Sequence, residues 1–100
     1  MRYAALPDDA QQVFAQLGVF AGSFDLSAAL AVIGYPLYLE PDDLTDTLDV
    51  LVQRSLLDYD PATQRYTQHD LLRAFALTRL TADTERAARL RHARSYANLL

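Results

Sequence analysis

The sequence predicts a mainly α-helical domain that carries one small β-hairpin. Apolar residues recur at helical spacing in five separate stretches. Between the third and the fourth stretch, two short runs rich in leucine, tyrosine and threonine flank the turn sequence DPATQ. No apolar run is long enough to cross a bilayer, and 100 residues have room for one compact core.

Two helices are predicted in the first third of the chain. The first lies in LPDDAQQVFAQLG, where the proline and the two aspartates suit a first helical turn and Gly18 ends the helix. The second lies in DLSAALAVIG, where Asp25 can cap the first turn and Gly34 ends the helix. Their predicted buried faces consist of Ala10, Val13, Phe14 and Leu17, and of Leu26, Ala29, Leu30 and Ile33.

A third helix and the hairpin follow. The stretch PDDLTDTLDVLVQRS has Pro41 at or near a helix start and an acidic first turn. Its predicted buried stripe consists of Leu44, Leu48, Leu51 and Val52. The next stretch, LLDYDPATQRYTQ, predicts two strands joined by a turn at residues 60–64, with Tyr59 and Tyr66 packed across the hairpin.

Two more helices are predicted after the hairpin. The stretch DLLRAFALTRL has an apolar face formed by Leu72, Phe75, Ala76 and Leu80. The stretch DTERAARLRHARSYANLL predicts a last helix in which Glu85 pairs with Arg89 and the arginines point outward. The residues predicted to point inward from this helix are Leu90, Ala93, Ala97 and Leu100.

This order of elements predicts a winged helix, which is a helix-turn-helix pair followed by a two-stranded wing, with an extra C-terminal helix. The second and third helices form the helix-turn-helix pair, and residues 60–64 form the wing tip. We expect residues 1–80 to be the winged-helix domain and residues 81–100 to be a C-terminal helix that starts a following segment. We therefore expect the 100 residues to be a piece of a longer protein.

The composition argues against several kinds of chemistry. Cysteine is absent and the two histidines, His69 and His92, are far apart, so we predict no disulfide and no metal site. All nine basic residues are arginine, which excludes a phosphate-binding loop of the type that needs a lysine. No cluster of nucleophile, base and orienting group is visible, so we predict no enzyme. The N-terminus lacks a secretory apolar segment, so the predicted location is the cytoplasm, with no membrane partner.

The charges are divided unevenly along the chain. Residues 1–53 carry one arginine and eight carboxylates, a net charge of −7, whereas residues 54–100 carry eight arginines and five carboxylates, a net charge of +3. A DNA-binding winged helix places its third helix in the major groove, with basic residues on the phosphates. Here that helix has no basic residue before Arg54 and carries Asp42, Asp43, Asp46 and Asp49.

These acidic residues predict a surface for protein rather than for DNA. The helix dipole alone explains aspartates in the first turn of the third helix. Asp46 and Asp49 lie beyond that turn, and we predict that they bind a protein partner with basic residues. Two alternatives stay open, namely a DNA-binding winged-helix regulator of transcription and an oligomerisation module that uses the last helix.

Four blocks of the sequence resemble a known family. They are LPDDAQQVFAQLGVFAGSFDLSAALAV, LDVLVQRSLLDYD, RYTQHDLLRAFALTRL and RHARSYANLL. In this order they are similar to the winged-helix domain that follows the nucleotide-binding core of bacterial STAND-type, NB-ARC-containing ATPases, including large transcriptional regulators. The resemblance implies a non-catalytic regulatory module, packed on that core and followed by a helical, often TPR-like, domain. It also implies that ADP or ATP binds to the full-length protein and that the isolated domain holds no cofactor.

The same resemblance implies a role for His69. In the NB-ARC branch, a Met-His-Asp motif lies at the junction between strand and helix, and its histidine approaches the β-phosphate of ADP. Gln68, His69 and Asp70 occupy these positions, so the histidine and the aspartate match and the methionine does not. His69 is therefore a candidate ADP-phosphate contact in the intact protein, at a helix N-terminus where anions are favoured. Asp70 is predicted to be the N-cap of that helix; without the resemblance, His69 is simply a surface residue at a junction.

Overall fold

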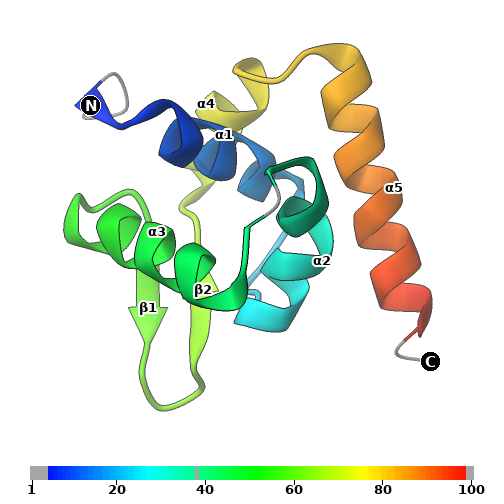
Figure 1. The fold of residues 1–100 in the computed structure, drawn as a ribbon. Helices are drawn as coiled ribbons and strands as arrows, with labels where there is room; N and C mark the ends of the chain where they lie inside the picture. The colour runs from blue at the N-terminus through cyan, green and yellow to red at the C-terminus, as the bar shows by residue number, and fades with distance from the viewer. Residues whose placement is uncertain (1–4, 38, 99–100) are drawn as a thin grey trace.

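The chain folds into a mainly helical domain with one β-hairpin, as predicted. Within the residues that the structure describes, four α-helices and the hairpin come first, and a fifth helix follows them. The structure is a computed structural model and describes residues 5–37 and 39–98. The elements are α1 (Asp8–Gln16), the 3-10 turn η2 (Leu17–Val19), α2 (Leu26–Leu37), α3 (Pro41–Gln53), β1 (Asp58–Asp60), β2 (Arg65–Thr67), α4 (Asp70–Thr78) and α5 (Ala82–Asn98). Figure 1 shows α3 and the hairpin on one side of the molecule and α5 on the other, with α2 between them.

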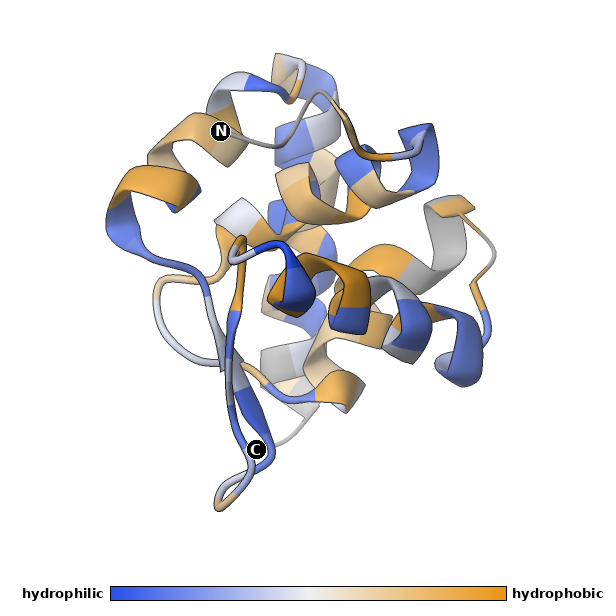
Figure 2. Cartoon of the chain, turned by 90° about the vertical axis from the view of Figure 1, so that its left-hand side faces the viewer, coloured by the Kyte–Doolittle hydropathy of each residue, from blue (hydrophilic) through white to orange (hydrophobic). Residues whose placement is uncertain are grey.

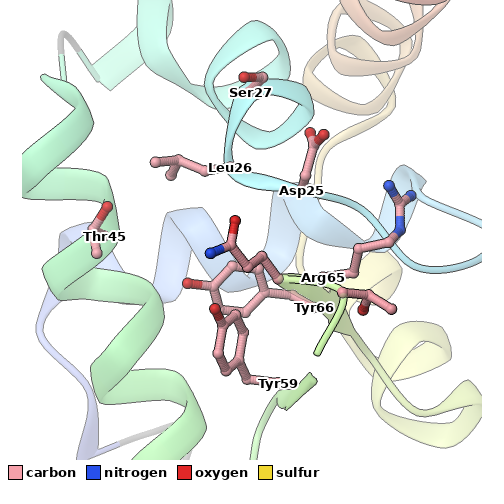
Figure 3. A pocket seen from close by; sticks show the side chains of 9 residues that line it. Asp25, Leu26, Ser27, Thr45, Tyr59, Arg65 and Tyr66 are labelled. Atoms are coloured by element: carbon pink, nitrogen blue, oxygen red, sulfur yellow. The ribbon is translucent and has the colours of Figure 1, made fainter. Parts of the chain in front are cut away.

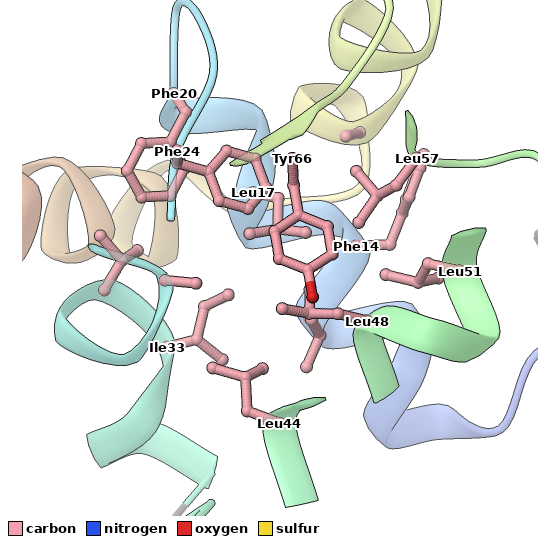
Figure 4. Packing of buried hydrophobic residues seen from close by; sticks show 14 of the residues in the cluster. Phe14, Leu17, Phe20, Phe24, Ile33, Leu44, Leu48, Leu51, Leu57 and Tyr66 are labelled. Atoms are coloured by element: carbon pink, nitrogen blue, oxygen red, sulfur yellow. The ribbon is translucent and has the colours of Figure 1, made fainter. Parts of the chain in front are cut away.

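The core lies where α1, α2 and α3 meet the hairpin. Phe14, Ile33 and Leu48 are fully buried, as their helical spacing predicted. Figure 4 shows these side chains converging with Leu44 and Leu51 from α3. Burying one such side chain contributes roughly 1.5–3 kcal/mol. The predicted apolar faces of the first three helices are thus the source of the core, although Leu26, Leu30 and Val52 are only half-buried.

The start of α2 agrees with the prediction and its end does not. The Ala28 N–H donates to Oδ1 of Asp25 at 2.8 Å, which is the predicted cap. Gly34 was predicted to end the helix, but α2 continues to Leu37. A glycine inside a helix costs about 1 kcal/mol relative to alanine, and this cost does not by itself end a helix that is held by tertiary packing.

The hairpin is a two-stranded antiparallel sheet in which Tyr59 lies opposite Tyr66. Their ring centroids are 4.8 Å apart, so the predicted packing across the hairpin is confirmed. The turn is closed by Asp60, whose carboxylate accepts a backbone N–H bond of 2.9 Å within the turn, and by Gln64, which has a φ of 57°. Asparagine and glycine are the usual residues at positive φ, so the turn accepts some strain at Gln64.

A second pairing fixes the hairpin to the rest of the domain. Phe24, in the loop before α2, exchanges two backbone hydrogen bonds of 2.9 and 2.8 Å with Tyr66. The Phe24 ring stacks on the Tyr66 ring on one side and on the Phe20 ring on the other. Phe24 therefore takes both backbone hydrogen bonds of Tyr66, while Tyr59 lies opposite Tyr66 in the hairpin; the sequence did not predict the pairing with Phe24.

Helix α4 packs closely on the 3-10 turn η2. Arg73 Nε donates to the carbonyl oxygen of Gly18 at 2.9 Å. A Cβ placed on Gly18 would lie 3.1 Å from Cγ of Leu77 and 3.2 Å from Cβ of Ala76. These distances are tighter than most carbon contacts, so Gly18 lets α4 approach closely, and its role here is not an unusual backbone angle.

Helix α5 packs along α2 through a different face from the predicted one. Leu90 is 50% exposed, Ala93 and Ala97 are exposed, and Leu100 lies outside the described residues. The side that faces α2 consists instead of Ala88, which is fully buried, and the half-buried Arg91, His92 and Ser95.

Hydrogen bonds and one ring contact explain the face that α5 uses. Arg91 donates from Nε to the carbonyl oxygen of Val32 at 2.5 Å and from a terminal nitrogen to Oε1 of the buried Gln16 at 2.9 Å. The His92 ring meets the Phe20 ring edge-on at 4.8 Å. The predicted pair of Glu85 with Arg89 is present at 3.0 Å.

None of the helices within residues 5–37 and 39–98 combines the length and the apolar character that a membrane span needs.

Candidate functional site

The outer face of α3 is a row of carboxylates. Leu44, Leu48 and Leu51 point into the core, so the opposite face of the helix is turned towards solvent. The aspartates at positions 42, 43, 46 and 49 are all exposed, and no ion pair to any of them forms within the described residues. Pro41 is the first residue of the helix, as predicted. The helix that would read DNA in a DNA-binding relative therefore presents negative charge.

The wing adds to this negative charge. It protrudes from the body and is hydrophilic along most of its length (Figure 2). Asp58 and Asp60 are exposed on β1. The one arginine of the wing, Arg65, is turned towards the loop before α2, where it donates from Nε to Oγ of Ser23 and from a terminal nitrogen to the Ser23 carbonyl oxygen, both at 2.8 Å. The surface of α3 and the wing is thus acidic overall.

A groove of about 410 Å³ lies between the start of α2, helix α3 and the wing (Figure 3). It is lined by Asp25, Leu26, Ser27, Thr45, Tyr59, Thr63, Gln64, Arg65 and Tyr66. The sequence analysis did not predict this groove, because its walls come from three elements that are separate in sequence. The sequence feature that could have indicated the groove is the pair of tyrosines in the hairpin, Tyr59 and Tyr66, for which the sequence predicts packing only.

Tyr66 is the least exposed polar residue of the groove, with 7% of its surface accessible. No hydrogen bond to its hydroxyl group forms within the described part of the chain. Burial raises the pKa of the Tyr66 phenol, and the carboxylate of Asp49 and the phenol of Tyr59 raise it further. The hydroxyl group therefore keeps its proton through the neutral and mildly alkaline range.

His69 lies at the junction between β2 and α4 and has a partner within the chain. Its Nε2 is 2.8 Å from Oδ2 of Asp58, and the two side chains are 65% and 62% exposed. The imidazole is therefore accessible from solvent, but one of its nitrogens faces a carboxylate rather than an open anion site. An exposed pair of this kind contributes little to stability.

The prediction that Asp70 caps α4 is wrong by one residue. The helix begins at Asp70, and His69 is the N-cap, with φ −59° and ψ 149°. The His69 carbonyl oxygen accepts the first helical bond, at 2.7 Å from the Arg73 nitrogen. Among the described residues, no side-chain hydrogen bond caps the start of this helix. Asp70 is exposed in the first turn, where the helix dipole favours a carboxylate.

Gln68, at the position of the methionine in the resembled motif, is a buried residue with 6% of its surface accessible. Its Nε2 donates to the Phe14 carbonyl oxygen at 3.3 Å, while its Oε1 is buried without a partner among the described residues. Gln68 therefore fills a packing position against α1, and its side chain is not directed at the surface that His69 occupies.

The other histidine, His92, lines a smaller pocket of about 270 Å³ between α5 and the loop before α2, with Phe20 and Phe24 on its apolar side. Within residues 5–37 and 39–98, no three histidine, cysteine, aspartate or glutamate side chains are grouped to hold a metal ion.

Helices α2 and α3 followed by a two-stranded wing define the winged helix-turn-helix class, whose members bind DNA or act as regulatory modules. A family model described as a winged helix-turn-helix domain matches residues 6–81. The chain belongs to this family. Comparisons with curated proteins and with solved structures gave no match.

Proposed function

We propose that the chain is a non-catalytic regulatory module of a STAND/NB-ARC-type ATPase. The module packs on the nucleotide-binding core, responds to ADP versus ATP, and passes this state to a C-terminal helical domain in signalling or transcriptional regulation. Nucleotide belongs to the full-length protein in the cytoplasm, and the isolated chain holds none. The observation that carries the regulatory half of the proposal is the row of exposed aspartates on α3.

The acidic surface argues against the alternative, a winged helix that binds DNA through α3. Duplex DNA carries one negative charge per roughly 1.7 Å of its axis. Two like charges 4 Å apart repel by about 1 kcal/mol even in water. Docking α3 in the major groove would bring several aspartates close to phosphates, and Arg54 and Arg65 already donate to oxygen atoms of Ala5 and Ser23.

The nucleotide-sensing half rests on the resemblance around His69. The exposed imidazole at the start of α4 can donate to a phosphate oxygen once it leaves Asp58. A hydrogen bond to a charged group contributes about 1.5–3 kcal/mol, which is a bias of roughly 10- to 150-fold between two states. Leu71, two residues further on, is 86% exposed and supplies an apolar contact for a neighbouring domain beside the imidazole.

ADP release from the full-length protein tests this half of the proposal. His69→Ala should speed ADP release by roughly tenfold or more, because the closed state loses a hydrogen bond to phosphate. Arg94→Ala, an exposed change on α5, is the control and should leave the rate unchanged. A wild-type rate of ADP release in His69→Ala would contradict the sensing role.

A further inference from the structure

From the structure we infer that the groove between α3 and the wing binds an arginine side chain of a basic segment in a partner protein. The inference rests on the proposed function only in treating α3 as a surface for protein rather than for DNA. Three features of the groove carry it: the carboxylates along one rim, the hydroxyl group of the largely buried Tyr66, which has no partner within the described residues, and the exposed aromatic ring of Tyr59 beside it.

The carboxylates follow from the spacing of α3. Thr45 lines the groove, and Asp42 and Asp49 lie three residues before it and four residues after it, so all three share one side of the helix. Both aspartates are exposed. The effect of the Asp49 carboxylate on the pKa of Tyr66 indicates that Asp49 lies near the groove. The rim on the side of α3 is therefore negative.

The interior of the groove on the same side carries three hydroxyl groups that can accept hydrogen bonds, those of Thr45, Tyr59 and Tyr66. Tyr66 as a whole is 7% exposed, and its hydroxyl group has no hydrogen-bond partner within the described residues but remains accessible from the groove. Figure 3 shows the hydroxyl ends of Tyr59 and Tyr66 directed towards the side on which Thr45 lies. The Thr45 hydroxyl donates its proton to the Pro41 carbonyl oxygen at 2.9 Å, so it can only accept a bond from a ligand.

The exposed ring of Tyr59 completes a site for a flat cation. Tyr59 is 40% exposed, and its ring packs at 4.8 Å on that of Tyr66. A guanidinium group stacks on aromatic faces and presents five N–H donors in a rigid plane. It can therefore cover Tyr59 while donating to the Tyr66 oxygen and to the Asp49 carboxylate.

Other ligand classes fit the groove less well. An anion at the α3 side would meet the Asp49 carboxylate, and Arg65, the one cation among the described lining residues, is held at the other side of the groove by two bonds to Ser23. A purely apolar ligand would leave the Tyr66 hydroxyl buried without a partner, which is costly. The volume of about 410 Å³ admits the side chain together with part of the backbone that carries it.

Fluorescence anisotropy with a labelled peptide of arginine, glycine and serine tests the inference on the chain as it stands. The probe should bind saturably, and the same peptide with citrulline in place of arginine, an uncharged analogue of similar shape, should not. Asp49→Asn and Tyr59→Leu should each weaken binding by roughly tenfold, the loss that corresponds to about 1.4 kcal/mol. Tyr59→Leu keeps apolar bulk and removes the aromatic face.

Asp43→Asn is the matched control, because it makes the same change of charge on the same helix, two positions from Thr45 and therefore on another face. It should weaken binding by no more than about twofold, since exposed charges are screened over roughly 10 Å. Circular dichroism checks folding, and if Tyr59→Leu does not fold, Asp49→Asn carries the test.

Two results would overturn the inference. Equal weakening by Asp43→Asn and Asp49→Asn would show diffuse attraction to an acidic surface rather than a site in the groove. Failure of the arginine peptide to bind would remove the site altogether. Neither result contradicts the proposed function. Saturable binding of duplex DNA by the chain would contradict the proposed function as well as this inference.

Discussion

The aspartates of α3 and the arginines of α4 and α5 differ in whether their side chains have partners within the described chain. On α3, Asp42, Asp43 and Asp46 point to solvent and form no ion pair within the described residues. Elsewhere in the molecule, arginines of α4 and α5 hold elements together. Arg73 donates to the Gly18 carbonyl oxygen, and Arg91 donates to the carbonyl oxygen of Val32.

This difference changes the meaning of the charge counts. The net charge of +3 in residues 54–100 resembles the signature of a nucleic-acid-binding segment. Several of those arginines already donate to carbonyl oxygens, and Arg86 and Arg89 pair with acidic residues of α5. Part of the net charge of −7 in residues 1–53 lies instead on the exposed aspartates of α3. We infer that the positive side stabilises the fold and that the negative side is available for binding.

The largest effect is expected from Arg91→Ala. This change removes the donors to the Val32 carbonyl oxygen and to Oε1 of the buried Gln16. A hydrogen bond to a charged group contributes about 1.5–3 kcal/mol, so the free energy of unfolding should fall by roughly 3 kcal/mol in urea titrations. Arg94→Ala, an exposed arginine on the same helix, should change it by less than about 0.5 kcal/mol. Equal effects of the two changes would mean that Arg91 does not hold α5 in place.

A smaller loss is expected from Gly18→Ala, at the contact between η2 and α4. The added methyl group would meet the Cβ of the buried Ala76, which cannot move aside as the end of a long side chain can. Thermal and urea unfolding should show a loss of roughly 1–2 kcal/mol. Gly22→Ala is the control, because no atom lies within 4 Å of the position that its methyl group would occupy, and it should be neutral or slightly stabilising. A neutral Gly18→Ala would contradict the close packing of α4.

Tyr66→Phe probes the polar interior of the groove by way of pH. Because burial, Asp49 and Tyr59 raise the pKa of the Tyr66 phenol, the unfolded chain releases this proton first as pH rises above about 10. Above that pH the folded state binds more protons than the unfolded state, so stability falls with rising pH. Tyr66→Phe should reduce this fall and should change stability little at pH 7, since the hydroxyl has no partner within the described chain. An unchanged alkaline profile in urea unfolding would count against a buried phenol.

The smallest effect on stability is expected from Asp46→Asn, on the acidic side. Asp46 is exposed on α3 and makes no ion pair with described residues. Its replacement should change the free energy of unfolding by less than about 0.5 kcal/mol in urea titrations. A loss as large as that of Arg91→Ala would mean that the acidic side also holds the fold together.

Where helical spacing was strong, the sequence was a good guide to the fold. Leucines at positions 44, 48 and 51 leave one possible buried face for α3, and the structure uses it. The last helix is rich in alanine and arginine, so its pattern favours no single face. Its true contact depends on hydrogen bonds from Arg91 to Val32 and Gln16, residues that no local pattern connects with it.

The candidate site was predictable only in part. The pairing of Phe24 with Tyr66 joins single residues from distant segments and leaves no periodic signal. The contact of His69 with Asp58 could have been predicted more easily. Asp58 lies opposite Thr67 in the hairpin, and His69, two residues after Thr67, is therefore a diagonal neighbour of Asp58. The exposure of Asp46 and Asp49 followed directly from the burial of the leucines beside them.

The most direct test of the regulatory interpretation is a titration of the chain with a fluorescently labelled DNA duplex at low salt, followed by anisotropy. The acidic surface of α3 and the wing predicts no saturable binding, even where electrostatic attraction would be least screened. Saturable binding that weakens steeply with added salt, and that is lost in Arg65→Ala, would contradict it, because it would show α3 and the wing in contact with phosphates.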